Sequence, residues 1–178
     1  MDADLAAVSS DLKSVAVRSI HHMAGGSRAE FDDVVHPDGF TRERKAAPPS
    51  ARGEGPAAFY ELACWLRAAI EDLSYEIHHA VTEGDLVAVS STMRGRHTGT
   101  IVFYGGQAEV TQAFAPTGKT FAITQSHWFR MKDGKIIEHW ANRDDLGMAR
   151  QLGWVPPTPL YLMRCARLKR QARKRLPV

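Results

Sequence analysis

Cysteine is scarce in this sequence of 178 residues. Cys64 and Cys165 are its two cysteines, and neither belongs to a C-x-x-C spacing. A pair so far apart in the chain excludes a small fold held by disulfides, and it excludes a zinc site with cysteine ligands. We therefore expect both thiols to be reduced and partly buried.

Long hydrophobic runs are missing as well. The longest apolar stretches, such as Leu86 to Val89, are far shorter than the ~20 residues that a membrane-spanning helix needs. The N-terminal stretch MDADLAAVSSDLKS is acidic and lacks the basic and apolar regions of a secretory signal. These two absences predict a cytoplasmic protein.

Signatures of several enzyme classes are absent too. The sequence contains no G-x-S-x-G, no glycine-rich phosphate loop and no H-E-x-x-H. Its adjacent histidines, His21-His22 and His78-His79, make poor metal sites, because neighbouring side chains point apart on helices and strands. These pairs therefore predict no metal site, and the missing glycine-rich loop predicts no nucleotide cofactor.

Acidic residues are missing from the C-terminal end. The last 19 residues, from Leu160, hold seven Lys and Arg, which leaves 16 basic residues against 20 acidic ones in the body. No platform of aromatic side chains for base stacking accompanies these charges, which disfavours nucleic-acid binding. We predict that residues 160–178 form a basic helical tail that docks on the body; an acidic partner or an anionic membrane is the alternative. The apolar stripe that would dock is Tyr161, Cys165, Leu168 and Ala172.

The spacing of apolar residues changes once along the chain. Up to Leu73 the spacing predicts two helices, one ending at Gly25-Gly26 and one over Ala57 to Leu73. Between them, VVHPDGFT is expected to be irregular, and ERKAAPPSARGEGP is expected to be a mobile loop. Beyond Leu73 the period becomes two, which predicts strands over 75–81, 86–104, 119–131 and 135–143.

The order of these elements indicates the fold class. Helices followed by antiparallel strands predict a single α+β domain over residues 1–159. In such a domain the helices cover one face of a strongly curved sheet, and the space between them can hold a small ligand.

The last hairpin decides which side chains face that space. A two-residue loop at residues 133–134 would place His127 opposite Trp140 and turn Ala141 away. A three-residue loop with a glycine bulge would instead pair His127 with His139 and turn Ala141 to the same face. The pattern alone fits both registers, because two adjacent isoleucines follow the turn.

Seven segments give the sequence a family resemblance. They are HPDGF, GEGPAAFYELACWLRAAIEDL, EGDLVAV, GRHTG, PTGKTF, HWFRMKDGKIIEHW and RDDLGMARQLG, in this order between His36 and Gly153. Together they resemble the SnoaL-like polyketide cyclase family of the NTF2-like superfamily. The resemblance implies a cone-shaped α+β fold with an apolar pocket, a homodimer or larger oligomer, and ring closure by an intramolecular aldol reaction without a cofactor. It also favours the bulged register of the last hairpin.

The family's site residues carry over only in part. The family histidine corresponds to His127 and its glutamine neighbour to Gln125, whereas the acid/base aspartate corresponds to Ala141. An alanine cannot transfer a proton, so another group has to do so in an active enzyme. The catalytic candidates are His127, His139 and Asp144. Their structural alternatives are a hydrogen-bonded core histidine, a half-exposed strand residue and a helix cap, respectively.

The remaining candidates would bind a hydrophobic small molecule that carries a carbonyl group. Among them, Asn142 falls on the outward face in the bulged register, and a surface turn is the alternative for His97. The aromatic candidates could equally belong to the core. The predicted substrate-binding residues are Phe40, Trp65, His97, Gln125, Phe129, Ala141, Asn142 and Arg143.

Two functions fit these observations. The first is a cofactor-independent cyclase, isomerase or lyase that acts by acid-base chemistry on a molecule such as a polyketide. The second is a non-catalytic binding protein that has kept the pocket and lost the catalytic aspartate. Ala141 favours the second function, whereas His127 and Gln125 favour the first, which we prefer.

Overall fold

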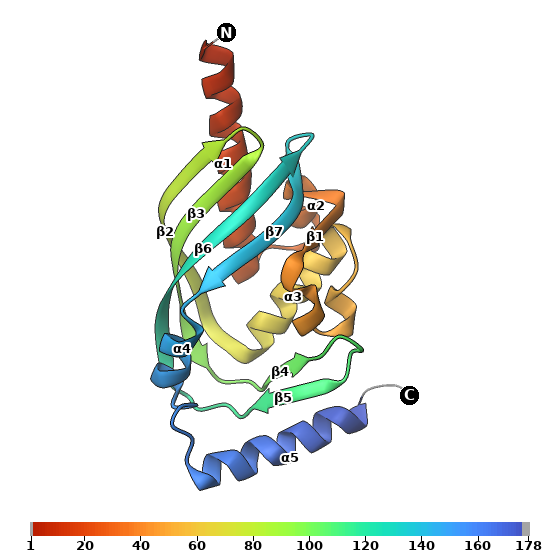
Figure 1. The fold of residues 1–178 in the computed structure, drawn as a ribbon, viewed down its shortest axis with the longest axis vertical. Helices are drawn as coiled ribbons and strands as arrows, with labels where there is room; N and C mark the ends of the chain where they lie inside the picture. Colours follow the sequence, from red (N-terminus) through yellow and green to blue (C-terminus); the bar gives the residue numbers. More distant parts are fainter. Residues whose placement is uncertain (1, 176–178) are drawn as a thin grey trace.

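A five-stranded sheet bends around the N-terminal helices (Figure 1). The computed structural model describes the backbone of residues 2–175 and the side chains of residues 11–175. The strand order is β1-β7-β6-β3-β2, and all neighbours are antiparallel except β1 and β7. This arrangement confirms the α+β class. The elements are α1 (Asp2–Gly25), α2 (Arg28–Val34), α3 (Gly55–Ala69), β1 (Val35–Thr41), β2 (Ile70–Glu83), β3 (Leu86–His97), β6 (Thr120–Lys132) and β7 (Lys135–Arg143).

Local signals in the sequence set the helix ends. The Ser27 hydroxyl accepts a hydrogen bond from the Glu30 amide, and the Glu30 carboxylate accepts one from the Ser27 amide, which together start α2. Pro56 lies in the first turn of α3, where its missing N–H needs no helical partner. Helix α1 ends at Gly25, as predicted.

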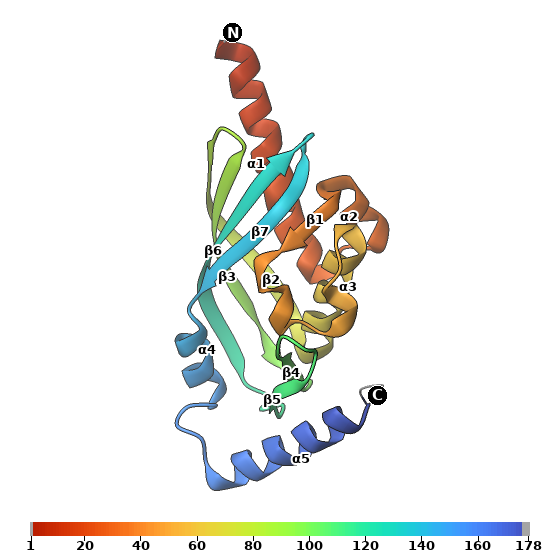
Figure 2. The ribbon, with the colours of Figure 1, turned by 45° about the vertical axis from the view of Figure 1, so that its right-hand side comes forward.

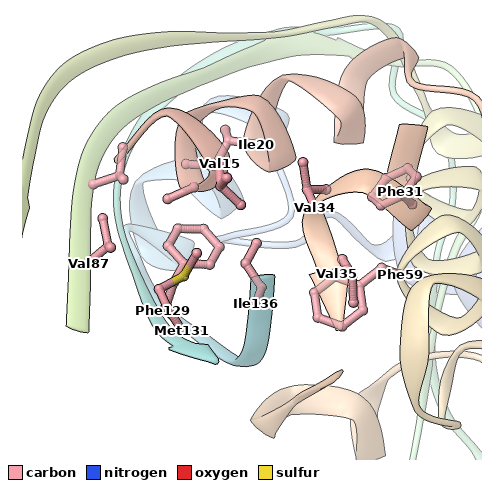
Figure 3. Packing of buried hydrophobic residues seen from close by; sticks show 13 residues of the cluster. Val15, Ile20, Phe31, Val34, Val35, Phe59, Val87, Phe129, Met131 and Ile136 are labelled. Carbon is pink, nitrogen blue, oxygen red and sulfur yellow. The ribbon is translucent and has the colours of Figure 1, made fainter. Parts of the chain in front are cut away.

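One core joins the helices to the concave face of the sheet (Figure 3). Figure 2 shows α1 and α3 lying on this inner side of the bent strands. Burying one such large apolar side chain contributes roughly 1.5–3 kcal/mol, so the cluster suffices to hold the helices on the sheet. Its larger members are Val15, Ile20, Phe31, Val34, Val35, Phe59, Val87, Phe129, Met131 and Ile136.

Three segments before β3 differ from expectation. The second helix stops at Ala69, four residues early, and Ile70 and Leu73 belong to β2. Both remain at least partly buried. The apolar spacing therefore predicted correctly that these residues are buried, but it predicted a helix where the backbone is extended. VVHPDGFT, expected to be irregular, contains β1, because its backbone pairs with the edge of β7. The segment expected to be a loop contains two 3-10 turns, Arg42–Ala46 and Pro49–Ala51.

The long strand expected over residues 86–104 is interrupted. β3 ends at His97, and the next residues form a separate hairpin of β4 (Ile101–Tyr104) and β5 (Val110–Phe114). The interruption occurs where the amides of Thr98 and Gly99 both donate to the Ala69 carbonyl, which draws the chain away from the sheet. Strand β5 was not predicted.

The β6–β7 hairpin combines features of both predicted registers. Its loop has two residues, Asp133 and Gly134, whose φ angles of 49° and 74° are both positive. A bulge in β7, between the pairs Arg130–Glu138 and Met131–Ile136, then shifts the register.

The bulge decides which face each residue of β7 occupies. As a result His127 lies opposite Ala141, so the predicted pairing with His139 is wrong by two residues. The shift of two preserves the face, and His127, His139 and Ala141 all point inward as predicted.

The C-terminal segments close the lower end of the molecule in Figure 1. After α4 (Asp145–Leu152), α5 (Pro159–Arg175) runs along β5. Tyr161 and Cys165 are buried there, and the Tyr161 hydroxyl donates to the Ala115 carbonyl at 3.1 Å. The described part of the tail therefore docks on the body through the expected stripe, while its last three residues, 176–178, lie outside the described residues. No helix in the described chain is long and apolar enough to span a membrane.

Candidate active site

A cavity lies between the helices and the concave face of the sheet. Its volume, counted as the space that the centre of a water molecule can occupy, is about 110 Å³. Its walls are mainly apolar, with Ile20 and Met23 from α1 and Phe59 and Leu62 from α3. Ser19 and some of the aromatic residues add polar atoms to the lining. The other polar residues come from β6, from β7, from the end of β1 and from the turn that follows β1. These polar residues are Thr41, Glu43, Gln125, His127, His139 and Arg143.

Three of these residues, Gln125, His127 and His139, form a hydrogen-bonded chain along the polar wall, and Thr41 lies at its end. Gln125 and His127 occupy odd positions of β6 and His139 an odd position of β7, so the pleat turns all three inward. His127 Nε2 lies 2.7 Å from Gln125 Oε1, and His127 Nδ1 lies 3.1 Å from His139 Nε2. At the other end, His139 Nδ1 lies 3.4 Å from the hydroxyl of Thr41.

This chain fixes the tautomers of the two rings when both are neutral. Because Gln125 Oε1 can only accept, His127 Nε2 donates to it. His127 Nδ1 is then an acceptor and takes the N–H of His139 Nε2. The remaining nitrogen, His139 Nδ1, carries a lone pair that faces Thr41. Neither imidazole therefore keeps a free N–H for a substrate.

Burial keeps both rings uncharged. Desolvation is the main cause that lowers the pKa of His127 to about 3, and the nearby His139 and Arg143 lower it further. Desolvation also lowers the pKa of His139 to about 4, with Arg143 as the second cause. Near pH 7 both imidazoles are neutral, and such low pKa values make them weak proton acceptors.

The carboxylate of Glu43 reaches the cavity beside Ala141, whose own side chain carries no acid. Glu43, in the turn after β1, accepts a hydrogen bond from the Ala141 amide at 3.2 Å through Oε1. Its Oε2 accepts one from the Thr41 hydroxyl at 2.8 Å. Pairing of β1 with β7 ends at Thr41 and His139, so the Ala141 amide lies on an open strand edge, and the carboxylate satisfies it.

The comparisons with known proteins point to one family. The model of the family described as SnoaL-like polyketide cyclase matches residues 15–152. The chain belongs to this family. It is 31% identical over 129 residues to nogalonic acid methyl ester cyclase of Streptomyces nogalater, which covers 72% of this chain and 87% of that protein.

Two further SnoaL-like relatives come from other Streptomyces strains. The chain is 34% identical over 111 residues to aklanonic acid methyl ester cyclase DnrD of Streptomyces peucetius, which covers 59% of this chain. It is also 34% identical over 111 residues to aklanonic acid methyl ester cyclase DauD of Streptomyces sp. (strain C5). The matches span 66% and 60% of these two relatives, just under two thirds of their lengths.

Solved structures share the SnoaL-like fold. TsrD from Streptomyces laurentii superposes with a TM-score of 0.65 at 23% identity, over 81% of this chain and 96% of that one. IdmH from Streptomyces antibioticus gives a TM-score of 0.59 at 23% identity, over 80% and 98% of the two chains. At such low identity these matches support the fold, and they carry no conclusion about substrate.

The structure brings most of the predicted site residues together. His127, His139, Gln125, Ala141 and Arg143 line the polar side of the cavity through β6 and β7. Two aromatic residues complete this set, because the cavity walls also include Trp65 and Phe129.

The other four predicted residues lie outside the cavity. The Asp144 carboxylate caps α4 by accepting from the Gly147 amide at 2.8 Å. Asn142 is exposed on the outward face of β7, as the alternation of that strand requires. Phe40 precedes the inward-facing Thr41 and points away from the cavity, beneath the guanidinium of Arg44. His97, expected at the mouth or in a surface turn, is fully buried against Trp154, with ring centroids 5.3 Å apart.

A second chamber lies next to the first. It lies between the β4–β5 hairpin, α4 and the sheet. Its volume, counted in the same way, is about 250 Å³. Both chambers are lined by Trp65, Leu66, Met93, Phe103, Gln125 and Arg143. Arg143 and Gln125 thus lie where the two chambers meet, each offering polar groups to a molecule that occupies both.

Glu43, Thr41 and the second chamber were not predicted from the sequence. Glu43 stands in a segment whose proline, glycine and charge content resembles a solvated loop, and its inward direction depends on the parallel pairing of β1 with β7. The alternation Phe40-Thr41 would have indicated Thr41 if β1 had been recognised as a strand. Within the described residues, no three His, Cys, Asp or Glu side chains come together as a metal site would require.

Proposed function

We propose that the protein is a cofactor-independent polyketide ester cyclase, which closes a ring in its substrate by an intramolecular aldol reaction. The observation that carries this proposal is the hydrogen-bonded wall of Gln125, His127 and His139 inside an apolar cavity, in a chain that belongs to the SnoaL-like family. Such a wall places few, fixed polar groups in a mainly apolar site, as small-molecule sites do.

The shape of the cavity supports an extended, hydrophobic substrate. Two adjacent chambers with aromatic walls offer space for a molecule of several fused or linked rings. Arg143 lies at their junction and can donate to a carbonyl oxygen, including one that becomes negatively charged during ring closure. The methyl esters of aklanonic and nogalonic acid, named for the relatives, are therefore the substrates to test first.

The histidine pair has a defined part in this proposal. Being neutral and bonded to each other, His127 and His139 present a polar surface without burying a charge. We assign to them the positioning of Gln125, whose Oε1 accepts from His127 and which lines both chambers, while another group of the cavity performs the acid-base step. Asp144 has no part in the proposed reaction, because its carboxylate is bonded to the start of α4.

The alternative is a non-catalytic binding protein. Ala141 was the reason to consider it, but a carboxylate from Glu43 reaches the Ala141 amide, so a proton acceptor is present at the cavity. We therefore favour the enzyme.

The deciding experiment is turnover of the two methyl esters by the purified protein. An intramolecular aldol reaction gives a product of the same mass as the substrate, so we expect a new chromatographic peak of unchanged mass. Ala141→Phe should remove this activity with little change in melting temperature, because the added ring fills the cavity from a half-buried position. Tight binding of both esters without any turnover would favour the binding protein instead.

Homodimerisation in the cytoplasm completes the proposal. The outer face of the sheet carries Trp128 and Trp140, whose rings stack with centroids 6.2 Å apart and suit a contact between two sheets. We expect the mass of a dimer or larger oligomer in light scattering at micromolar concentration. Trp128→Glu should shift this mass to that of a monomer, and a monomeric parent protein would refute the assembly. The described chain offers no comparable support for binding nucleic acid.

A further inference from the structure

We propose that Glu43 is the general base that takes over the proton transfer for which Ala141 has no side chain. This inference rests on the proposed cyclase function and assigns a catalytic residue to it. Glu43 is a carboxylate at the cavity lining, and its Oε1 lies 3.2 Å from the backbone nitrogen of Ala141. The Glu43 carboxylate, from the turn after β1, thus takes the place of the aspartate that the family resemblance predicts at position 141 of β7.

Hydrogen bonds hold the Glu43 carboxylate in a defined orientation. The Ala141 amide donates to Oε1, and the Thr41 hydroxyl donates to Oε2 at 2.8 Å. A carboxylate has about four lone-pair sites, so these two bonds leave acceptor positions open toward the cavity. Two fixed donors orient the group as a base in an enzyme requires, without protonating it.

The neighbouring residue anchors the segment from outside. Arg42 lies on the opposite side of the same turn, where its Nε donates to Glu138 Oε1 at 2.7 Å. Its guanidinium carbon also lies 3.7 Å from the ring centroid of Trp140. Arg42 therefore binds the outer face of β7 while Glu43 faces the inner side, which fixes the turn against the strand that carries Ala141.

The other titratable groups of the wall are less suited to accept a proton. Gln125 and the His127–His139 bond occupy both nitrogens of His127. The free lone pair of His139 faces Thr41, not the centre of the cavity. Arg143, the cationic group of the lining, can donate but cannot accept. Glu43 lines the chamber that holds this wall, whereas Asp145, the other acid among the lining residues of the two chambers, lies 3.4 Å from Arg143 Nε.

The proposed step is balanced within one substrate molecule. The Glu43 carboxylate accepts the proton of an acidic C–H next to a carbonyl group, and the electron pair of that bond forms an enolate. The enolate carbon attacks a second carbonyl carbon of the same molecule, forming the C–C bond of the new ring. The resulting alkoxide takes the proton back from Glu43, so no oxidant, reductant or second substrate is consumed.

The test is Glu43→Gln, assayed with aklanonic and nogalonic acid methyl esters. Glutamine keeps an acceptor oxygen for the Ala141 amide but cannot take up the proton, so kcat should fall by ~10²- to 10⁴-fold while KM and the melting temperature change little. In D2O, deuterium should enter the acidic carbon of substrate recovered from the parent protein, and this exchange should disappear in the variant. The matched control is Glu54→Gln in the same loop, an exposed carboxylate whose partner Arg44 lies 3.4 Å away, and it should keep the parent kcat.

A second variant keeps the test decisive if Glu43→Gln also melts at a lower temperature. Adding Ala141→Asp to Glu43→Gln returns a carboxylate to the cavity, so kcat should recover about tenfold or more relative to Glu43→Gln, even without recovery of stability. Turnover by the parent protein with full activity in Glu43→Gln would overturn the role of Glu43 and leave the cyclase function standing. Loss of exchange in His127→Gln but not in Glu43→Gln would assign the base to His127. If the parent protein neither exchanges nor cyclises either ester, the cyclase function fails and the role of Glu43 fails with it.

Discussion

The imidazoles of His127 and His139 face each other across 3.1 Å and share one N–H between Nδ1 of the first ring and Nε2 of the second. A proton added to His127 Nδ1 would point at this N–H, and a charge on either ring would be shielded from water by the surrounding core. The pair is therefore stable only while both rings are neutral.

Acid should destabilise the fold through this pair. The pKa of His127 falls from 6.5 to about 3 on folding, mainly by desolvation, and that of His139 falls to about 4. The unfolded chain thus binds protons below pH 6.5 that the folded chain does not bind. The contribution is fully present above pH 6.5 and is lost as the pH falls toward 4, with a slope of up to about 1.4 kcal/mol per pH unit for His127. Chemical denaturation between pH 7.5 and 4 measures it.

A double variant separates this effect from the titration of carboxylates. His127→Gln with His139→Gln should be less stable than the parent protein at pH 7.5, and the difference should shrink as the pH falls toward 4. His79→Gln, at an exposed position of β2, is the matched control and should follow the parent curve. A constant difference between the double variant and the parent protein would contradict neutral buried rings.

The Asp144 carboxylate should matter for stability and not for catalysis. Asp144→Ala removes the acceptor for the Gly147 amide at the start of α4, which should cost about 1 kcal/mol of unfolding free energy. Turnover per folded molecule should stay at the parent value, because Asp144 does not line the cavity. Asp144→Ser retains a capping oxygen and should recover most of the stability; a large drop in kcat in both variants would return Asp144 to the catalytic candidates.

The β6–β7 turn should be sensitive to the residue at position 134. Gly134 has a φ of 74°, where a side chain costs roughly 1–2 kcal/mol, so Gly134→Ala should lower the unfolding free energy by about that amount. Gly106, in a turn with open space around its Cα, is the matched control, and Gly106→Ala should have a smaller effect. Thermal or denaturant unfolding of the two variants distinguishes these outcomes.

Filling the second chamber should weaken substrate binding and leave the hydrogen-bonded wall of Gln125, His127 and His139 in place. Ala149 on α4 lines this chamber but not the first one, so Ala149→Phe should raise KM for the methyl esters by about tenfold, which corresponds to about 1.4 kcal/mol of lost binding. The kcat at saturation should change less. Arg150→Ala, at the next and exposed position, should leave KM unchanged; equal KM values for both variants would mean that the substrate stays in the first chamber.

Periodicity predicted the elements whose burial follows a simple pattern. The bounds of β7 were predicted to the residue, and the inward face of β6, with Gln125 and His127, followed from its alternation. The helix predicted over 57–73 ended early, because Ile70 and Leu73 continue the apolar spacing while the backbone already pairs with β3. Spacing records which residues are buried, and a buried residue can be helical or extended.

The parts of the site that the sequence did not predict depend on contacts between distant segments. Glu43 enters the cavity because β1 pairs with β7 about 100 positions later in the chain, and no local pattern around Glu43 indicates that pairing. The register of the last hairpin required a bulge within β7, after the turn, where the sequence shows only two adjacent isoleucines. In both places the relevant energy lies in tertiary pairing, which overrides local preference.

Helix α5 has a consequence for how this protein could diverge from its relatives. The family match ends at residue 152, and Trp154, which lines the second chamber, follows it. So does α5, whose Tyr161 hydroxyl donates to the carbonyl of Ala115, the residue after Phe114 in the wall of that chamber. The hydrogen-bonded wall is therefore encoded within the shared part of the chain, whereas one side of the second chamber depends on residues beyond it. Substitutions in this C-terminal part would change the space open to a bound molecule while leaving the hydrogen-bonded wall in place.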